Sequence, residues 1–105
     1  MSGPSPRMIS LVLEAPGRVA LATAATPSPA PGWCLVAVRY VGLCGTDLGF
    51  WDGSSNYLRD GLKAFPFVPG HEWSGTVAAV GPDVTGLRPG DRVAGHNIRP
   101  CNACA

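Results

Sequence analysis

The sequence has few charged residues and no cluster of either sign. Eight basic and seven acidic side chains make up 14% of its 105 residues and leave a formal net charge of +1, whereas an average soluble domain is about 25% charged. It contains no run of Lys or Arg that would attract a polyanion. We therefore expect neither nucleic acid nor an anionic membrane surface as a partner.

Long hydrophobic runs are also missing. The longest early apolar run, Met8 to Leu13, is interrupted by Ser10 and stops at Glu14. A signal peptide needs an apolar core of about 7 to 15 residues, and a membrane-spanning helix needs about 20. We expect neither segment, and the four cysteines fit reduced thiolates in the cytoplasm better than disulfides of a secreted protein.

The dinucleotide-binding pattern Gly-x-Gly-x-x-Gly is absent as well. A chain of 105 residues has room for one modest domain, which excludes a complete two-domain, dinucleotide-dependent enzyme. The sequence is instead rich in turn residues, with 14 glycines and 11 prolines. Because these are the poorest residues for helix interiors, they argue against a helical bundle.

Short segments of strand length, separated by Gly/Pro turns, dominate the rest of the chain. Trp33 to Val41 is the clearest, with apolar residues on both faces, and we expect it to be central and well buried. The predicted strands are Met8 to Glu14, Arg18 to Ala22, Trp33 to Val41, Ser74 to Val80 and Arg92 to Ala94. Their number predicts a mainly β fold, a compact barrel.

The remaining segments are predicted to be a leader, a helix and a loop. Met1 to Arg7 is rich in Pro, Ser and Gly and is expected to be flexible. Thr46 or Asp47 is expected to cap a short helix that runs through Trp51. Gly53 to Phe67 shows no period and is expected to be a surface loop.

Two short segments carry residues that can bind a metal, namely Cys44 in a Gly-flanked turn and the pair His71-Glu72. Zinc accepts sulfur, imidazole nitrogen and carboxylate oxygen, and catalytic zinc sites use three protein ligands and an open position. Adjacent strand residues point to opposite faces, so the pair can share one ion only if the chain leaves strand geometry there. Pro69-Gly70 would allow that. Taken singly, a packed thiol, a structural histidine and a surface carboxylate are the plainer interpretations.

A third candidate is Cys101-Asn102-Ala103-Cys104, whose spacing lets two sulfurs hold one zinc from a tight turn. A closed structural site needs four ligands, so this is interpreted as half of a zinc lobe. The alternative, a redox pair, normally opens a helix in a βαβ setting that this sequence lacks. Cys34, inside an apolar run, is interpreted as a small hydrophobic residue.

Three runs together resemble the zinc-dependent alcohol dehydrogenases, which are medium-chain dehydrogenases. They are Val41 to Asp47, Val68 to Gly75 and Pro89 to Val93, in the family's order and approximate spacing. The matched region is the family's N-terminal, GroES-like catalytic domain. The resemblance implies a partial β-barrel with one or two short helices over residues 8–105, truncated within the structural zinc lobe and without a Rossmann domain.

The resemblance also implies the metal ligands. Cys44 and His71 match the ligands of the catalytic zinc, and Glu72 matches the carboxylate beside that histidine, which ligates the ion or approaches it from behind. Cys101 and Cys104 match the first two of four structural zinc cysteines. A structural zinc is therefore expected only if the other two cysteines are present.

For catalysis, Thr46 matches the hydroxyl that binds the substrate oxygen and starts a proton relay, and Asp47 matches a carboxylate that orients the ligating histidine. The family's zinc acts as a Lewis acid on that oxygen, and NAD or NADP accepts the hydride. Many relatives carry a second proton-shuttling histidine where this chain has Gly49. The relay beyond Thr46 must then use water or another group.

The prediction is the N-terminal catalytic-domain portion of a zinc-dependent, NAD(P)-linked dehydrogenase that oxidises a secondary alcohol, polyol, sugar or cyclitol. The segments Phe50 to Gly61 and Gly70 to Gly75 resemble the polyol and sugar branch. Homo-oligomers are expected only of the complete enzyme, and the 105-residue chain alone is expected to be inactive. The alternative is a non-catalytic GroES-like remnant or binding module. A zinc-free quinone reductase relative is disfavoured because such relatives lack this Cys/His pair.

Overall fold

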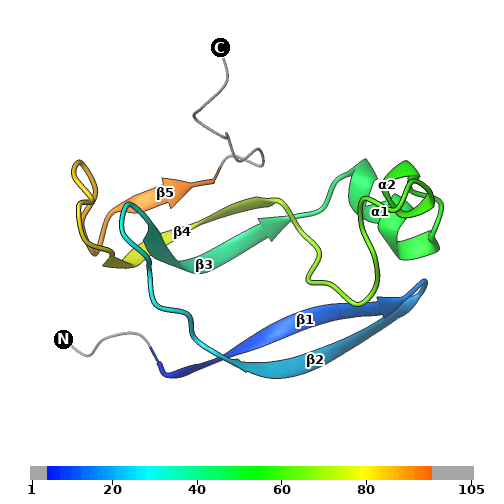
Figure 1. Ribbon diagram of the computed structural model, residues 1–105, viewed down its shortest axis with the longest axis horizontal. Helices are drawn as coiled ribbons and strands as arrows, with labels where there is room; N and C mark the ends of the chain where they lie inside the picture. Colours follow the sequence, from blue (N-terminus) through cyan, green and yellow to red (C-terminus); the bar gives the residue numbers. More distant parts are fainter. Residues whose placement is uncertain (1–4, 96–105) are drawn as a thin grey trace, which may run out of the picture.

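Turns at glycine and proline divide the chain into five strands and two short helices in the computed structural model, which describes residues 5–95 (Figure 1). The elements are β1 (Arg7–Ala15), β2 (Arg18–Ala25), β3 (Cys34–Gly42), α1 (Gly45–Asp52), α2 (Asn56–Arg59), β4 (Glu72–Val80) and β5 (Arg92–Ala94). A mainly β fold with one or two short helices is thereby confirmed. Over the described residues, no helix has both the length and the apolar character needed to cross a membrane.

Strands β1 and β2 form an antiparallel hairpin that closes at Pro16-Gly17, where Gly17 adopts a positive φ of 70°. Two contacts join this hairpin to the middle of the chain. The N–H of Gly17 donates to the carbonyl of Trp51 in α1 (2.7 Å), and Leu13 exchanges two backbone hydrogen bonds with Phe67 (2.8 and 3.1 Å). The hairpin therefore fixes the segment that leads into β4.

Strands β3, β4 and β5 form a second sheet in that order, all antiparallel. The prediction that the segment of β3 is central and well buried is wrong. Within residues 5–95, β3 pairs with β4 alone, and its Val38 and Tyr40 are 52% and 77% exposed. The middle position belongs to β4, because β5 pairs with its other edge. The apolar residues on the two faces of β3 therefore do not mark a central strand, since several of them are exposed to solvent.

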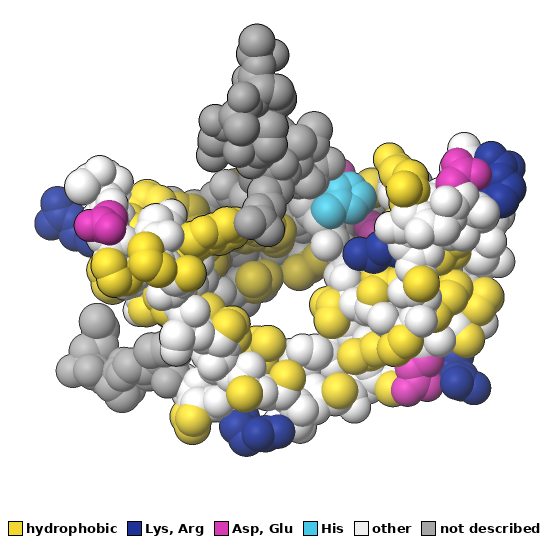
Figure 2. All heavy atoms as spheres, viewed as in Figure 1, with side chains coloured by type: hydrophobic (Ala, Val, Ile, Leu, Met, Phe, Trp, Pro, Cys, Tyr) yellow, Lys and Arg dark blue, Asp and Glu magenta, His cyan; other side chains and the backbone are white. Residues whose placement is uncertain are grey.

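The two sheets do not close into a compact barrel, so that prediction was wrong, whereas the partial barrel is confirmed. Figure 1 shows the hairpin and the three-stranded sheet as separate layers, with α1 and α2 together at one end. Figure 2 shows an opening between them in the same view. Among the described residues only Leu13 and Val77 are buried apolar side chains.

The expected leader and loop also differ in detail from the structure. Strand β1 already begins at Arg7, which pairs with Ala25, while residues 1–4 lie outside the described part. The segment expected to be an irregular loop contains α2, which Ser55 caps by accepting a hydrogen bond from Tyr57 N–H at 3.2 Å. A single helical turn of four residues is too short to show a period in the sequence.

Candidate metal centre

Cys44 lies at the junction where β3 ends and α1 begins. Its backbone is extended, with φ −128° and ψ 179°, and it is the residue that caps the N-terminus of α1. Extended backbone is usual for a helix cap, so the strand-like conformation persists up to the residue before α1. The half-buried thiol is therefore held by two regular elements rather than by a free loop.

Asp47 is the third helical residue of α1, and its carboxylate folds back onto the start of the helix. The N–H of Cys44 donates to its Oδ2 (3.0 Å), and the N–H of Asp47 donates to the carbonyl of Cys44 (3.0 Å). The bond to Oδ2 is the half of a capping box that the third helical residue supplies, and it satisfies the N–H of the cap residue. The helix cap was predicted at Thr46 or Asp47; the structure places the cap at Cys44 and gives Asp47 the supporting role.

His71 immediately precedes β4 and follows Gly70, whose φ is +100°. A Cβ on Gly70 would lie 3.0 Å from Cγ1 of Val41, so the chain needs glycine there for both its conformation and its close approach to β3. This turn lets His71 leave strand geometry, as required if its imidazole is to face α1. The register places Glu72, the first strand residue, opposite Gly42.

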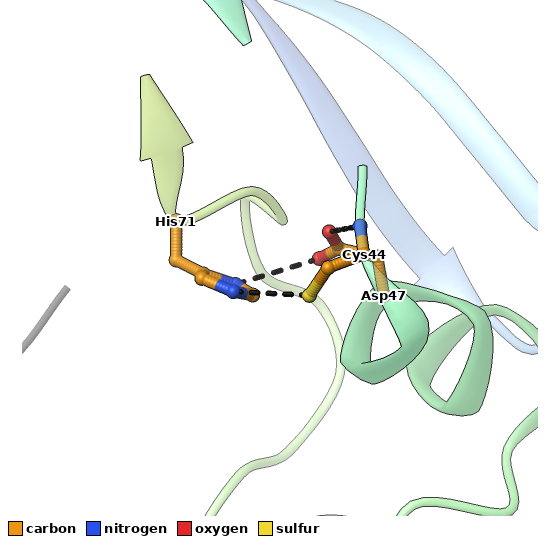
Figure 3. Close-up of side chains that lie close together, drawn as sticks. All are labelled: Cys44, Asp47 and His71. Carbon is orange, nitrogen blue, oxygen red and sulfur yellow. Dashed lines mark hydrogen bonds and ion pairs between the residues drawn. The ribbon is translucent and has the colours of Figure 1, made fainter. Parts of the chain in front are cut away.

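Three ligand atoms of these segments come together, as Figure 3 shows. Nε2 of His71 lies 3.1 Å from Sγ of Cys44, and Nδ1 of His71 lies 3.9 Å from Oδ1 of Asp47. All three ligand atoms lie within 4.8 Å of one another. The imidazole thus presents one nitrogen to the thiol and the other to the carboxylate, although 27 residues separate Cys44 from His71.

Asp47 carries an unusual buried oxygen. The residue is only 7% exposed, and its Oδ1 is buried without a hydrogen-bond partner among residues 5–95. An unpaired buried carboxylate oxygen is costly unless a donor or a cation compensates it. Nδ1 of His71 lies 3.9 Å from this oxygen, too far for a hydrogen bond.

The donor set fits zinc. Zinc binds thiolate sulfur at about 2.3 Å and imidazole nitrogen at about 2.0 Å, so one ion can contact two such atoms that lie 3.1 Å apart. A cation on Nε2 of His71 would leave the ring proton on Nδ1, the atom that faces the unpaired oxygen of Asp47. The orphaned oxygen is therefore what a metal-bound imidazole at this place requires.

Glu72, the other predicted ligand, is exposed and does not belong to this group of three. Its carboxylate lies over the end of β3, where a Cβ on Gly42 would be only 2.9 Å from its Oε2. That position is two residues from Cys44 in the sequence. Metal ligation by Glu72 stays a prediction.

The remaining predicted residues fall in three places. Thr46 is exposed in the first turn of α1, two residues after Cys44 in the sequence. Cys101 and Cys104 lie outside the described residues. Cys34 is half-buried at the start of β3, away from the group, and like Cys44 it is a free thiol.

A small pocket of about 200 Å³ adjoins the group, with Asp47 and His71 in its wall. The other lining residues come from α1, α2 and the segment up to Gly70; Tyr57 and Lys63 are among them. Sequence reasoning missed this part of the site because the segment was interpreted as a featureless loop. The cap at Ser55 and the aromatic residues around the chain's only lysine were the signals available.

Comparisons with known proteins agree with this geometry. Residues 30–105 match the sequence profile of the alcohol dehydrogenase GroES-like domain. Sorbitol dehydrogenase from Ovis aries is 42% identical over 91 residues, which are 87% of this chain and 25% of the relative. D-altritol 5-dehydrogenase from Agrobacterium fabrum is 44% identical over 89 residues, which are 85% of this chain and 25% of that protein. The chain thus spans about a quarter of the length of these relatives.

Solved structures share the fold as well. A short chain alcohol dehydrogenase from E. coli CFT073, complexed with NADH, superposes with a TM-score of 0.80 at 31% identity, over 95% of this chain and 27% of that one. A cobalt- and zinc-bound thermostable alcohol dehydrogenase from Pyrobaculum aerophilum gives a TM-score of 0.78 at 33% identity, over 93% of this chain and 29% of that one. The partial barrel described above is therefore of the GroES-like type.

Proposed function

The chain belongs to the alcohol dehydrogenase family, and from that premise we propose that it is the metal-binding catalytic portion of a zinc-dependent, NAD(P)-linked dehydrogenase. The observation that carries this proposal is that one ligand atom each of Cys44, Asp47 and His71 lie within 4.8 Å of one another. Thiolate sulfur and imidazole nitrogen are donors that catalytic zinc sites use, and such sites keep one position open for water or substrate. A carboxylate close to the imidazole can orient a ligating histidine.

We assign Cys44, His71 and Glu72 as the ligands of this zinc, and Asp47 as the carboxylate that orients the ring of His71. Support for the last role is the 3.9 Å approach of Asp47 Oδ1 to Nδ1 of His71. Cys101 and Cys104 remain proposed ligands of a second, structural zinc. When bound, the catalytic ion would supply Lewis-acid polarisation of the substrate oxygen.

The proposed substrate is a secondary alcohol of the polyol, sugar or cyclitol type. This choice is supported by relatives that are sorbitol and D-altritol dehydrogenases. In the reaction the carbinol carbon gives up a hydride, which NAD or NADP accepts, and the hydroxyl gives up a proton. The hydroxyl of exposed Thr46, two residues after Cys44 in the chain, is assigned as the first acceptor of that proton.

The proton must then reach solvent without help from position 49. Gly49 packs against Ser55, and the N–H of Ser55 donates to the carbonyl of Gly49 (3.1 Å). Since Thr46 is exposed, water is the carrier that we assign to the rest of the path. Two free thiols, Cys34 and Cys44, fit a reducing compartment, so we place the activity in the cytoplasm.

Zinc stoichiometry of the purified chain tests the site. Elemental analysis of Cys44→Ala and His71→Ala should show one zinc fewer per chain than the unmodified protein. Cys34→Ala is the matched control, because it removes a thiol outside the group. Equal zinc content in all four proteins would refute the assignment of Cys44 and His71 as ligands.

A further inference from the structure

The pocket beside the metal centre contains one cation that the proposed chemistry does not use. Lys63, the only lysine of the chain, lines this cavity of about 200 Å³ together with His71 and Asp47. No carboxylate lies within ion-pair distance of its ammonium among residues 5–95. An ammonium that makes no ion pair with a carboxylate of the described residues can bind an anion that enters from solvent.

An aromatic platform supports Lys63. Its Nζ lies 4.8 Å from the centre of the Phe67 ring, within the range of a cation–π contact. Two backbone hydrogen bonds to Leu13 hold the main chain of Phe67, and Phe50 packs edge-on against its ring with centroids 5.1 Å apart. Lys63 is exposed, and its contact with a ring whose main chain is bonded to β1 places the ammonium at the solvent-facing edge of the pocket.

Asp47 is the one carboxylate among the described residues that line the pocket, and it faces the start of α1 and His71. Asp47 accepts a hydrogen bond from the Cys44 N–H through Oδ2, and its Oδ1 faces Nδ1 of His71. Arg59, which does not line the pocket, pairs with Asp60 at 3.6 Å. Lys63 is therefore the cation that an anionic group in this pocket would meet.

We propose that this pocket recognises a substrate that carries a terminal anionic group, a phosphate ester or a carboxylate, whose charge pairs with Lys63. The inference rests on the proposed function, since it takes the oxidised carbon of the same molecule to be at the Cys44–His71 centre. The aromatic rings of Phe50 and Tyr57, whose centroids are 6.2 Å apart, line the same cavity and offer apolar faces to the carbon chain. The substrate class is thus an acidic or phosphorylated polyol rather than a neutral one.

Binding measurements on the zinc-loaded 105-residue chain test this proposal. Amide resonances near His71 are followed by NMR while sorbitol, sorbitol 6-phosphate or gluconate is added. We expect at least one anionic probe to bind about three- to tenfold more tightly than sorbitol, the gain of a charge-assisted hydrogen bond at a site open to solvent. The two anionic probes distinguish a phosphate site from a carboxylate site.

Variants isolate the contribution of the ammonium. Lys63→Gln should lose the preference for the anionic probe, whereas Lys63→Arg, which keeps the charge, should retain most of it. Arg88→Gln is the matched control, because it removes one positive charge outside this pocket. An anion bound directly to the zinc would be held equally by all these variants, so the difference between them reports Lys63 alone.

Two results would overturn the inference: an unmodified chain with no anion preference, or a Lys63→Gln variant that keeps it. Failure of the proposed function would be seen separately, as a chain whose zinc content does not depend on Cys44 and His71. A chain that binds zinc at those residues but ignores the anion would leave the dehydrogenase assignment intact. The NMR spectra of the variants also report whether each has kept its fold.

Discussion

At the scale of single residues, Asp47 connects the two halves of the metal centre. One oxygen holds the start of α1 through the Cys44 N–H, and the other faces His71 at 3.9 Å while lacking a hydrogen bond within residues 5–95. The same side chain therefore contacts the residue that we propose as the thiol ligand and faces the ring of the proposed imidazole ligand.

Asp47→Asn separates these two roles. The amide oxygen can still accept from the Cys44 N–H, but the charge that stabilises the metal-bound imidazole is lost. We expect zinc affinity, measured by competition with a chromophoric chelator, to fall about 10- to 100-fold, with thermal stability of the metal-free chain little changed. Glu72→Gln measures the contribution of the neighbouring carboxylate in the same assay. Unchanged affinity in Asp47→Asn would contradict the orienting role.

Asp52, at the end of α1, is the residue whose titration the structure alters most clearly. Hydrogen bonds from the hydroxyl and then the N–H of Ser54, the latter at 2.8 Å, lower the pKa of the Asp52 carboxyl from its ordinary value. Because the folded-state pKa is the lower one, this group stabilises the fold above its unfolded pKa. That contribution is lost as the pH falls through the folded pKa.

Ser54→Ala removes the hydroxyl and leaves the N–H donor in place. The Asp52 carboxyl should then titrate at a higher pH than in the unmodified chain, yet still below an unfolded aspartate, when followed by carbon NMR. An identical midpoint in the two proteins would show that the hydroxyl does not bind the carboxylate in solution.

At the scale of elements, the turn before β4 decides where His71 points. Gly70 has a φ of +100°, and a Cβ there would approach Val41 to 3.0 Å. Gly86 has a similar φ of +87°, but a Cβ there meets no other atom within 4 Å. The two glycines therefore differ in packing and not in backbone conformation.

Comparing Gly70→Ala with Gly86→Ala tests the effect of this packing difference on stability and zinc binding. Both should lose about 1–2 kcal/mol of unfolding free energy from the positive φ, and Gly70→Ala about 1 kcal/mol more because Val41 must shift. Only Gly70→Ala should also weaken zinc binding, since it moves His71 against Cys44. Urea denaturation and chelator competition measure the two effects. Equal zinc affinity in both variants would show that the turn at Gly70 does not position His71 for zinc binding.

The sequence predicted the strands more accurately than their surroundings. Alternation and Gly/Pro turns located β1 to β5 to within a few residues, because those signals are local. The same alternation misplaced β3, since a pattern with two apolar faces cannot tell a covered strand from an uncovered one. Bringing Cys44 to His71 required the family resemblance, because the bend at Gly70 and the junction at Cys44 depend on contacts far along the chain.

At the scale of the whole molecule, one face of the β1–β2 hairpin is apolar but covered only at its end. Leu11 pairs with Leu21 and, by the two-residue repeat of a strand, shares its face with Leu13. Leu13 is 2% exposed beneath the Phe67 segment, whereas Leu11 and Leu21 are 45% and 74% exposed. On this one face, side chains change from buried to exposed within a few residues. A closed barrel would bury the whole face.

This contrast makes a sharp prediction for leucine truncation on a single face. Leu13→Ala should lower the unfolding free energy by about 2 kcal/mol or more, because it removes a buried side chain. Leu21→Ala should cost less than about 0.5 kcal/mol, since its side chain already contacts water. Urea denaturation of both variants at low protein concentration measures the costs. If Leu21→Ala proved as costly as Leu13→Ala, the open face would have to be covered in solution, and sedimentation of the unmodified chain would then show whether a second copy covers it.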